Sequence, residues 1–504
     1  MKPGGDVSQS VRTVPPFAPL HPLVNSTDDQ NLPSPDTIAP ARAFRRCLDF
    51  WLSERMLLWG MAGFLAGYLV MWNVELQLMW LTAVCLPAGI VCCCRTRGAG
   101  ITREPMLRLA AAFLVWNIAV GLIRNPGTLA IYYTIEFLAG AVLLPVFLGG
   151  LWLVCRRPGE ARRLTLVLAW SGLFAAVAGL IYWWLVQSVE EPGARLRNPL
   201  VHGGQHPVGT AINLGFALVC TAAAFGGAGT RRARMICLAV IAVQCLAVML
   251  TLSRGALLAL GCVPTAMVLM VCVWLVVDLR RGLSFHASLQ TLARGWPKVW
   301  PPLITTAAVM VVFLQFVAPL IAPPSVTQQP VAGDPPVEVI VLSTLSSNPA
   351  REYIARSDSG RFHFYRIALS CIDSWDKVIT GAGLWGPELT IERETASAIN
   401  HMHSLFLATY IHGGIIGSAM LLGLIGLGVK KSWWLARAGQ PQWLAFLAYG
   451  LGGLIFDGQS ACSLVTHPRF ENLILWFPLI AIAALWRNLQ DAQTGRQPSS
   501  SESR

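Results

Sequence analysis

Residues 404–429 read SLFLATYIHGGIIGSAMLLGLIGLGV, and they establish the class of the fold. This stretch contains no Asp, Glu, Lys or Arg, and it is long enough for one helix to cross a bilayer, which takes about 20 apolar residues. Comparable blocks recur at residues 56–72, 76–94, 107–123, 129–154, 164–187, 208–226, 235–252, 255–277, 299–322, 442–456 and 472–486. Because backbone polar groups in hydrocarbon must bond within a helix, the sequence predicts an all-α integral membrane protein with about twelve transmembrane helices.

The overall composition supports this class. Of 504 residues, 54% are hydrophobic and 13% charged, whereas a soluble domain carries about 25% charged residues. The formal net charge of +12 would suit nucleic acid, but the basic residues lie mostly in short loops between apolar blocks, where they set topology. We therefore do not expect nucleic-acid binding.

Most of the 13 cysteines lie in apolar blocks or in predicted inner segments, where they act as small hydrophobic residues. Cys371 and Cys462 are different, because both map to predicted outer segments. An oxidising compartment permits a disulfide between them, and the sequence leaves open whether they pair.

The distribution of Lys and Arg predicts the orientation. With the N-terminus inside, the inner loops hold many more of these residues than the short outer loops, which hold Arg124, Arg195, Arg197, Arg254 and Arg469. Basic residues favour cytoplasmic loops, so both termini are expected in the cytoplasm.

Five segments follow from the blocks and the loops. Residues 1–41, rich in Pro, Ser, Asp and Asn without periodicity, are expected to be a disordered cytoplasmic tail, and residues 490–504 a second cytoplasmic tail. Residues 42–322 are expected to hold transmembrane helices one to nine, and residues 403–489 helices ten to twelve. The intervening residues 323–402 form a long outer loop, a length typical of functional connections.

This loop begins with a proline-rich part and continues into an amphipathic region. Apolar residues spaced by three to four, on one helical face, run from Gly360 to Trp375: Phe362, Tyr365, Leu369, Ile372 and Trp375. Such a face suits a helix on the membrane surface. A helix that caps the transmembrane bundle fits the pattern equally well.

Arginines in the predicted outer segments are the first candidate site residues. Arg254 stands in a turn between two apolar blocks, and the other members of the set are Arg195, Arg197, Arg361 and Arg366. Each alone fits headgroup anchoring or a salt bridge to Glu190, Glu191 or Asp358. Together they suit a diphosphate, which needs several fork-shaped donors converging on it.

Histidines are also concentrated outside, at His202, His206, His363, His401, His403 and His467. An imidazole can take a proton from a hydroxyl group, so a positioned outer histidine is a candidate general base. The pair His401 and His403 is two residues apart and does not share a helical face, so we expect no metal site there. No paired-carboxylate motif for a metal-bound nucleotide sugar and no P-loop is present.

A family resemblance rests on three motifs. His403-Ser404 is followed by nine residues and then Gly414-Ile415-Ile416-Gly417. This resembles the signature of bacterial O-antigen ligases. The loop from Ser359-Gly360-Arg361 through Trp375 to Gly381-Ala382-Gly383, and the turn Ser253-Arg254-Gly255, are similar to segments of the wider ligase and polymerase superfamily.

The resemblance implies a glycosyltransferase of the bacterial inner membrane with a site in a periplasmic loop, here 323–402. It implies transfer of O-antigen polysaccharide from undecaprenyl diphosphate to a sugar of the lipid A core, without a metal or another cofactor. His403 corresponds to the family's base, and Arg254 and Arg361 to its diphosphate clamp. Arg195, Arg197 and Arg366 correspond less directly.

Other functions stay open at this point. An O-antigen polymerase shares the donor and topology, and a protein O-oligosaccharyltransferase uses a different acceptor. A non-enzyme transporter of lipid-linked glycans would carry mid-membrane charges or half-repeats. Glu136 is the clearest mid-span charge. The glycines at 413, 414 and 417 also suit close helix packing alone.

Overall fold

The computed structural model describes residues 45–71, 73–96, 101–124, 130–190, 194–201, 206–282, 300–313, 315, 361–384, 386–387, 390–391, 402–458, 461–462 and 469–494. Within these ranges the side chains of 130–138, 300, 361–364 and 456 are not described. The chain divides into two units, 1–49 and 50–504, and the second carries α2 and every later element described below. The predicted tail 1–41, the proline-rich start of the loop, and Glu136 as a side chain lie outside the described residues.

Every regular element among the described residues is a helix. The elements are α2 (Glu54–Val70), α3 (Val74–Trp80), η1 (Leu81–Cys85), α4 (Leu86–Arg95), η2 (Ile101–Arg103), α5 (Pro105–Arg124), α6 (Ala130–Cys155), α7 (Glu160–Tyr182), η3 (Trp183–Gln187), α8 (Ser188–Glu190), α9 (Pro207–Gly226), α10 (Arg231–Leu250), α11 (Arg254–Arg280), α13 (Trp300–Val312), α16 (Arg361–Ser370), α17 (Trp375–Thr380), α19 (Leu405–Arg437), α20 (Gln442–Phe456), η6 (Asn472–Trp476) and α21 (Phe477–Gln493). The helix α21 continues past the predicted boundary at residue 489.

Within the described ranges, eight helical segments are long and apolar enough to cross a membrane. They are Val74–Arg95, Pro105–Arg124, Glu160–Glu190, Pro207–Gly226, Arg231–Leu250, Arg254–Arg280, Leu405–Arg437 and Asn472–Gln493. Three shorter apolar helices, Ala139–Cys155, Pro301–Val312 and Gln442–Ile455, fall at other predicted spans, as does α2. The helical membrane class is therefore confirmed, whereas the count of twelve crossings stays a prediction.

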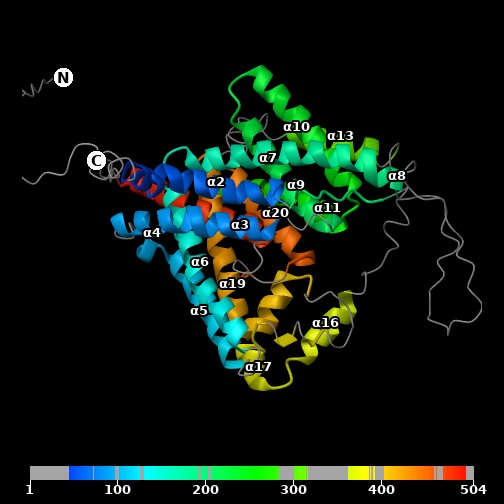
Figure 1. The fold of residues 1–504 in the computed structure, drawn as a ribbon. Coiled ribbons are helices and arrows are strands. Elements are labelled where there is room, and N and C mark those ends of the chain that lie inside the picture. The colour runs from blue at the N-terminus through cyan, green and yellow to red at the C-terminus, as the bar shows by residue number, and fades with distance from the viewer. Residues whose placement is uncertain are drawn as a thin grey trace, which may run out of the picture. The chain divides into compact units, whose positions relative to one another are not determined.

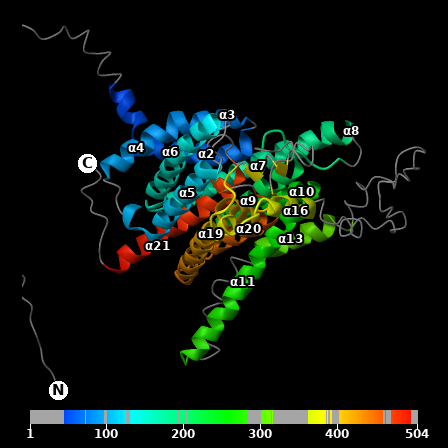
Figure 2. The ribbon, with the colours of Figure 1, turned by 90° about the horizontal axis from the view of Figure 1, so that it is seen from below.

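Burial separates central from peripheral helices. In α9, 78% of the most apolar window is buried, and in the η6–α21 segment 72%, whereas in α11 only 11% is buried. Figure 2 shows α11 extending away from its neighbours for much of its length. Exposed apolar side chains on such helices fit a hydrocarbon surrounding, where they need no protein partner.

The helix α20 positions one end of the site described below. It packs against α11 in the opposite direction, because Gly452 lies beside Ala259 and Cys262 while Leu444 lies beside Met270. The C-terminus of α20 and the N-terminus of α11 therefore lie at the same end of the pair.

The helices α5 and α19 also run antiparallel. Near one end, buried Lys431 of α19 forms an ion pair with Glu104, just before α5. Further along, Trp116 of α5 donates through Nε1 to the carbonyl of Gly413, 2.8 Å away. Gly417 also faces α5, near Trp116 and Asn117. The prediction of close packing is confirmed at Gly413, where an added Cβ would come within 2.8 Å of Asn117 Oδ1, whereas Gly417 leaves room for one.

Gly414 does more than pack, because it interrupts α19. Its φ of 64° and ψ of −159° are non-helical, and this region of backbone space is almost confined to glycine. We call residues 405–413 the first half-helix and Gly413–Gly414 the helix break. A break inside a membrane helix requires partners for the freed backbone groups.

The long loop supplies those partners. The amide of Ala382 donates to the carbonyl of Ile411 at 2.7 Å, and the amide of Gly383 donates to that of His412 at 3.2 Å. A Cβ on Gly381 would lie 2.2 Å from the His412 carbonyl oxygen, so only glycine fits there. We call residues 381–383 the docking segment. It follows α17, which lies beside α19 and α5 in Figure 1.

The expectation of one amphipathic helix from Gly360 to Trp375 is wrong. The helix α16 ends at Ser370, and α17 begins only at Trp375. The buried face of α16 is formed by Ile367 and Ala368, which pack with Met402, Ala408 and Ile411. Leu369 of α16 and Trp375 of α17 are exposed. The spacing of apolar residues did not indicate the turn between α16 and α17. The helix α16 packs on the first half-helix, as expected for a helix that caps the bundle.

Cys371 and Cys462, both described, are not joined by a disulfide. The thiol of Cys371 contacts the carbonyl of Ile367 in its own turn, with Sγ 3.6 Å from the oxygen. Of the two possibilities that the sequence left open, a disulfide or two free thiols, the structure has two free thiols.

Candidate functional site

The segment 194–201 carries Arg195 and Arg197 and is fixed by its neighbours in sequence. Leu196 is buried, and its amide donates to the carbonyl of Leu250 at 2.9 Å. Asn198 is buried too, and its amide nitrogen Nδ2 donates to the carbonyl of Ala175 at 2.7 Å. Because both anchors are buried, the two arginines are held between the C-terminus of α10 and the side of α7.

Arg195 binds the turn that precedes Arg254. Its Nε donates to the carbonyl of Thr251 at 2.7 Å, and its Nη2 donates to that of Leu252 at 3.3 Å. Leu252 has a φ of 51°, a left-handed conformation that is costly for a residue with a Cβ. The strained turn thus presents two carbonyls to Arg195 and places Arg254 at the first position of α11. Arg195 therefore lies beside the turn that carries Arg254, and a shared role of the two in binding a diphosphate stays a prediction.

His403 lies just before the first half-helix and faces Asp457, which follows the last residue of α20. The His403 Nδ1 and Asp457 Oδ1 atoms are 3.2 Å apart, and both side chains are largely buried, with 17% and 10% exposed. A carboxylate accepts hydrogen bonds, so this contact assigns the proton to Nδ1 and directs Nε2 elsewhere. His403 itself has a left-handed φ of 49°.

A second imidazole, His206, caps the N-terminus of α9. Its Nδ1 accepts from the amide of Val208 at 3.4 Å. Partial loss of hydration lowers the pKa of His206, and the nearby Arg195, His403 and Arg197 lower it further, while Asp457 opposes them. Arg195, Arg197, His403 and Asp457 are therefore all close enough to His206 to influence its charge.

The candidate site is therefore a group of polar side chains from four places in the chain. The segment before α9 gives Arg195, Arg197 and His206, the α10–α11 turn gives Arg254, and the ends of α19 and α20 give His403 and Asp457. Three arginines outweigh one carboxylate, so the region favours an anionic ligand. Across the part of the chain that the structure describes, no group of three or more His, Cys, Asp or Glu side chains could hold a metal ion.

The positions of Arg361 and Arg366 relative to the other site residues are defined only through their helix. Both belong to α16, which packs on the first half-helix that begins beside His403. The side chain of Arg361 lies outside the description, and Arg366 is exposed. Their part in an arginine cluster remains a prediction.

Comparison with known proteins supports the family seen in the motifs. An O-antigen ligase family model matches residues 237–422, from within α10 to within α19. Over this span the chain is similar to the O-antigen ligase family. The resemblance seen in the sequence motifs is thereby confirmed. No curated protein matched the chain.

The O-antigen ligase region holds Arg254, Arg361, Arg366 and His403. The remaining site residues, among them Arg195, His206 and Asp457, lie before or after it and come to the ligase region through folding. A site that joins both parts must be described from the whole chain.

Sequence reasoning missed Asp457 as the partner of His403. A usable signal was present, because Asp457 directly follows the apolar block 442–456, at the end predicted to face outward. A carboxylate at a helix end within reach of an outer histidine is a candidate orienting group.

We expect His206 to make the stability of this protein decrease in acid. Its pKa is lowered in the folded chain, so as the pH falls below about 6.5 the unfolded chain takes up a proton that the folded chain resists. The contribution of neutral His206 is thus present above that pH and lost below it. Thermal unfolding in detergent at pH 8 and pH 5.5 measures the loss. The variant His206→Asn keeps a capping residue and should lose less stability, and equal losses would contradict this assignment.

Proposed function

We propose that this protein is an O-antigen ligase, a metal-independent inverting glycosyltransferase. It moves O-antigen polysaccharide from undecaprenyl diphosphate to a sugar of the lipid A core in lipopolysaccharide biosynthesis. In this proposal it spans the bacterial inner membrane with both termini in the cytoplasm and the site in the periplasm. The observation that supports it best is the His403–Asp457 pair beside Arg195, Arg197 and Arg254.

The pair provides a base for the acceptor. With Nδ1–H directed to Asp457, His403 Nε2 takes the proton as the acceptor hydroxyl oxygen attacks the anomeric carbon of the donor. The bond from that carbon to the diphosphate oxygen breaks at the same time. Attack opposite the leaving group inverts the anomeric carbon, so a carboxylate nucleophile is not needed.

The arginines stabilise the leaving group. Undecaprenyl diphosphate gains negative charge as the bond breaks, and guanidinium groups bind phosphate oxygens through paired N–H donors. Such preorganised charge lowers the barrier without delivering a proton. Arg254 and Arg361 are the proposed clamp, with Arg195, Arg197 and Arg366 as further donor-binding residues. Since Arg195 already donates to two backbone carbonyls, we assign it mainly to fixing the Arg254 turn.

The ligase and polymerase reactions use the same donor, so the test must separate their products. In a strain that lacks this gene, lipopolysaccharide gels should lose every band with O-antigen, including the single-repeat band, while lipid-linked glycan accumulates. Survival of the single-repeat band would instead indicate a polymerase. Loss of glycan from periplasmic protein, with unchanged lipopolysaccharide, would indicate a protein O-oligosaccharyltransferase.

A second assay separates the enzyme from a transporter of lipid-linked glycans. Purified protein in detergent, given lipid-linked donor and lipid A core, should form the ligated product without added metal or nucleotide. A transporter would form no product under these conditions, because detergent removes the two compartments. Abolition of product by a chelator, with recovery on adding one divalent ion, would reject the metal-independent mechanism.

A further inference from the structure

The first half-helix connects two parts of the molecule that the proposed reaction needs. One end follows His403 and Ser404, and the other ends at the helix break. Its nine residues span about 13.5 Å at 1.5 Å per residue. Because a helix of this length is stiff, fixing the helix break in space also fixes His403.

The helix break is fixed by the docking segment. The carbonyls of Ile411 and His412 accept from Ala382 and Gly383, and the Gly381 and Gly414 backbones approach so closely that neither tolerates a Cβ. Whatever holds the docking segment therefore holds the end of the first half-helix.

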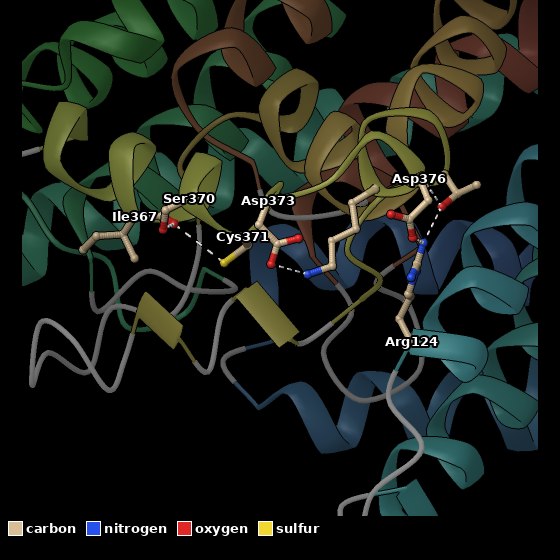
Figure 3. A network of polar contacts seen from close by, with 8 residues as sticks. Arg124, Ile367, Ser370, Cys371, Asp373 and Asp376 are labelled. Carbon is tan, nitrogen blue, oxygen red and sulfur yellow. Dashed lines mark hydrogen bonds and ion pairs between the residues drawn. The ribbon is translucent and has the colours of Figure 1, made fainter.

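Arg124 holds the docking segment from the other side. It is the last residue of α5, and its Nη2 contacts the carboxylate of Asp376 and donates to Thr380 Oγ1 at 3.0 Å. Figure 3 shows Arg124 reaching α17 in this way. Its Cβ also lies beside Gly383, where an added Cβ would come within 2.9 Å. Asp376 is a good partner, because hydrogen bonds from Ser374 and Arg124 lower its pKa to about 2 and keep it charged.

We propose that Arg124 and Asp376 are positioning residues for His403, acting through the docking segment and the first half-helix. This inference rests on the proposed role of His403 as the base. Neither residue touches the substrate in this proposal. Arg124 counts as an outer arginine by sequence, but its partner in the fold is the loop and not a diphosphate.

Kinetics of purified variants test the proposal. Arg124→Gln and Asp376→Asn should each lower kcat roughly three- to tenfold, since a largely solvated ion pair is weak but misplacement of a base is costly. The KM for lipid-linked donor should change less than about twofold, because no binding contact is lost. The double variant Arg124→Asp with Asp376→Arg should recover most of the lost kcat.

The chain offers a matched control on the same short helix. Lys377 Nζ pairs with Asp373 Oδ2 at 2.8 Å, and both residues belong to the long loop, so this pair does not join the loop to α5. Lys377→Gln should leave kcat unchanged. Wild-type kcat in both Arg124→Gln and Asp376→Asn, a change in KM alone, or an equal loss in Lys377→Gln would overturn the proposal.

A structural measurement tests the positioning role without measuring glycan transfer. Hydrogen exchange of purified protein should show faster exchange in residues 381–384 and 405–413 of Asp376→Asn, but not of Lys377→Gln. This result does not depend on which glycan is transferred. Unchanged exchange in both regions would overturn the positioning role. If the wild-type protein formed no ligated product while Asp376→Asn still showed the faster exchange, the proposed function would be rejected and not the coupling between these segments.

Discussion

The His403→Ala variant is expected to insert into the membrane normally and to transfer glycan roughly 10²–10⁴-fold more slowly, the usual contribution of a general base. His403 lies just before the first residue of α19 and not inside a helix, so its removal leaves the helices around it in place. The loss should appear in kcat, because the base acts in the transition state and not in donor binding. The measurement is the rate of product formation by purified protein, with membrane abundance measured in parallel.

The variant Asp457→Asn gives a graded comparison. It retains His403 but replaces the carboxylate by an amide, which can no longer enforce the proton on Nδ1. We therefore expect a loss smaller than that of His403→Ala and no added effect when both changes are combined, since the two residues act as one unit. Full ligation by His403→Ala would reject His403 as the base.

The Gly414→Ala variant is expected to lose stability and activity together. The backbone of Gly414 lies in a region that costs other residues about 1–3 kcal/mol. In addition, the new Cβ would lie 2.3 Å from the carbonyl oxygen of Ile379, a backbone atom that cannot move away alone. The docking segment must then separate from the helix break. Thermal unfolding in detergent and transfer rate should both fall well below wild type.

Gly417→Ala provides the control for that change. Gly417 belongs to the same helix and the same motif, but an added Cβ there would meet its neighbours at 3.5 Å or more, an ordinary contact. It should keep near wild-type stability and transfer. If Gly414→Ala were equally well tolerated, the helix break would have no role in holding the loop.

The helices could be predicted from the sequence because their signal is local. Apolar blocks such as 404–429 and 255–277 coincide with α19 and α11, since a membrane helix satisfies its own backbone. The arginines at 195 and 254 were recognised for a similar reason, because a basic residue in a short outer turn is unusual on its own.

The remaining parts depend on contacts between distant segments. The sequence places Asp457 at an outer helix end, but its pairing with His403 depends on the fold, because α19 begins where α20 ends. The helix break at Gly414 looks like an ordinary packing glycine in sequence, since its backbone conformation is imposed by the docking segment. The turn between α16 and α17 was missed because the apolar spacing continues across it.

Leu252 and His403, the two non-glycine residues with left-handed backbone among those described, both lie in the candidate site. Each such conformation costs about 1–3 kcal/mol, which the rest of the fold must offset. Selection for heat resistance would therefore favour Leu252→Gly, because glycine adopts this backbone conformation without the cost and the folded state becomes more stable. The same change would make the carbonyls that accept from Arg195 less fixed in position. A variant with higher thermal stability is therefore expected to have a lower transfer rate.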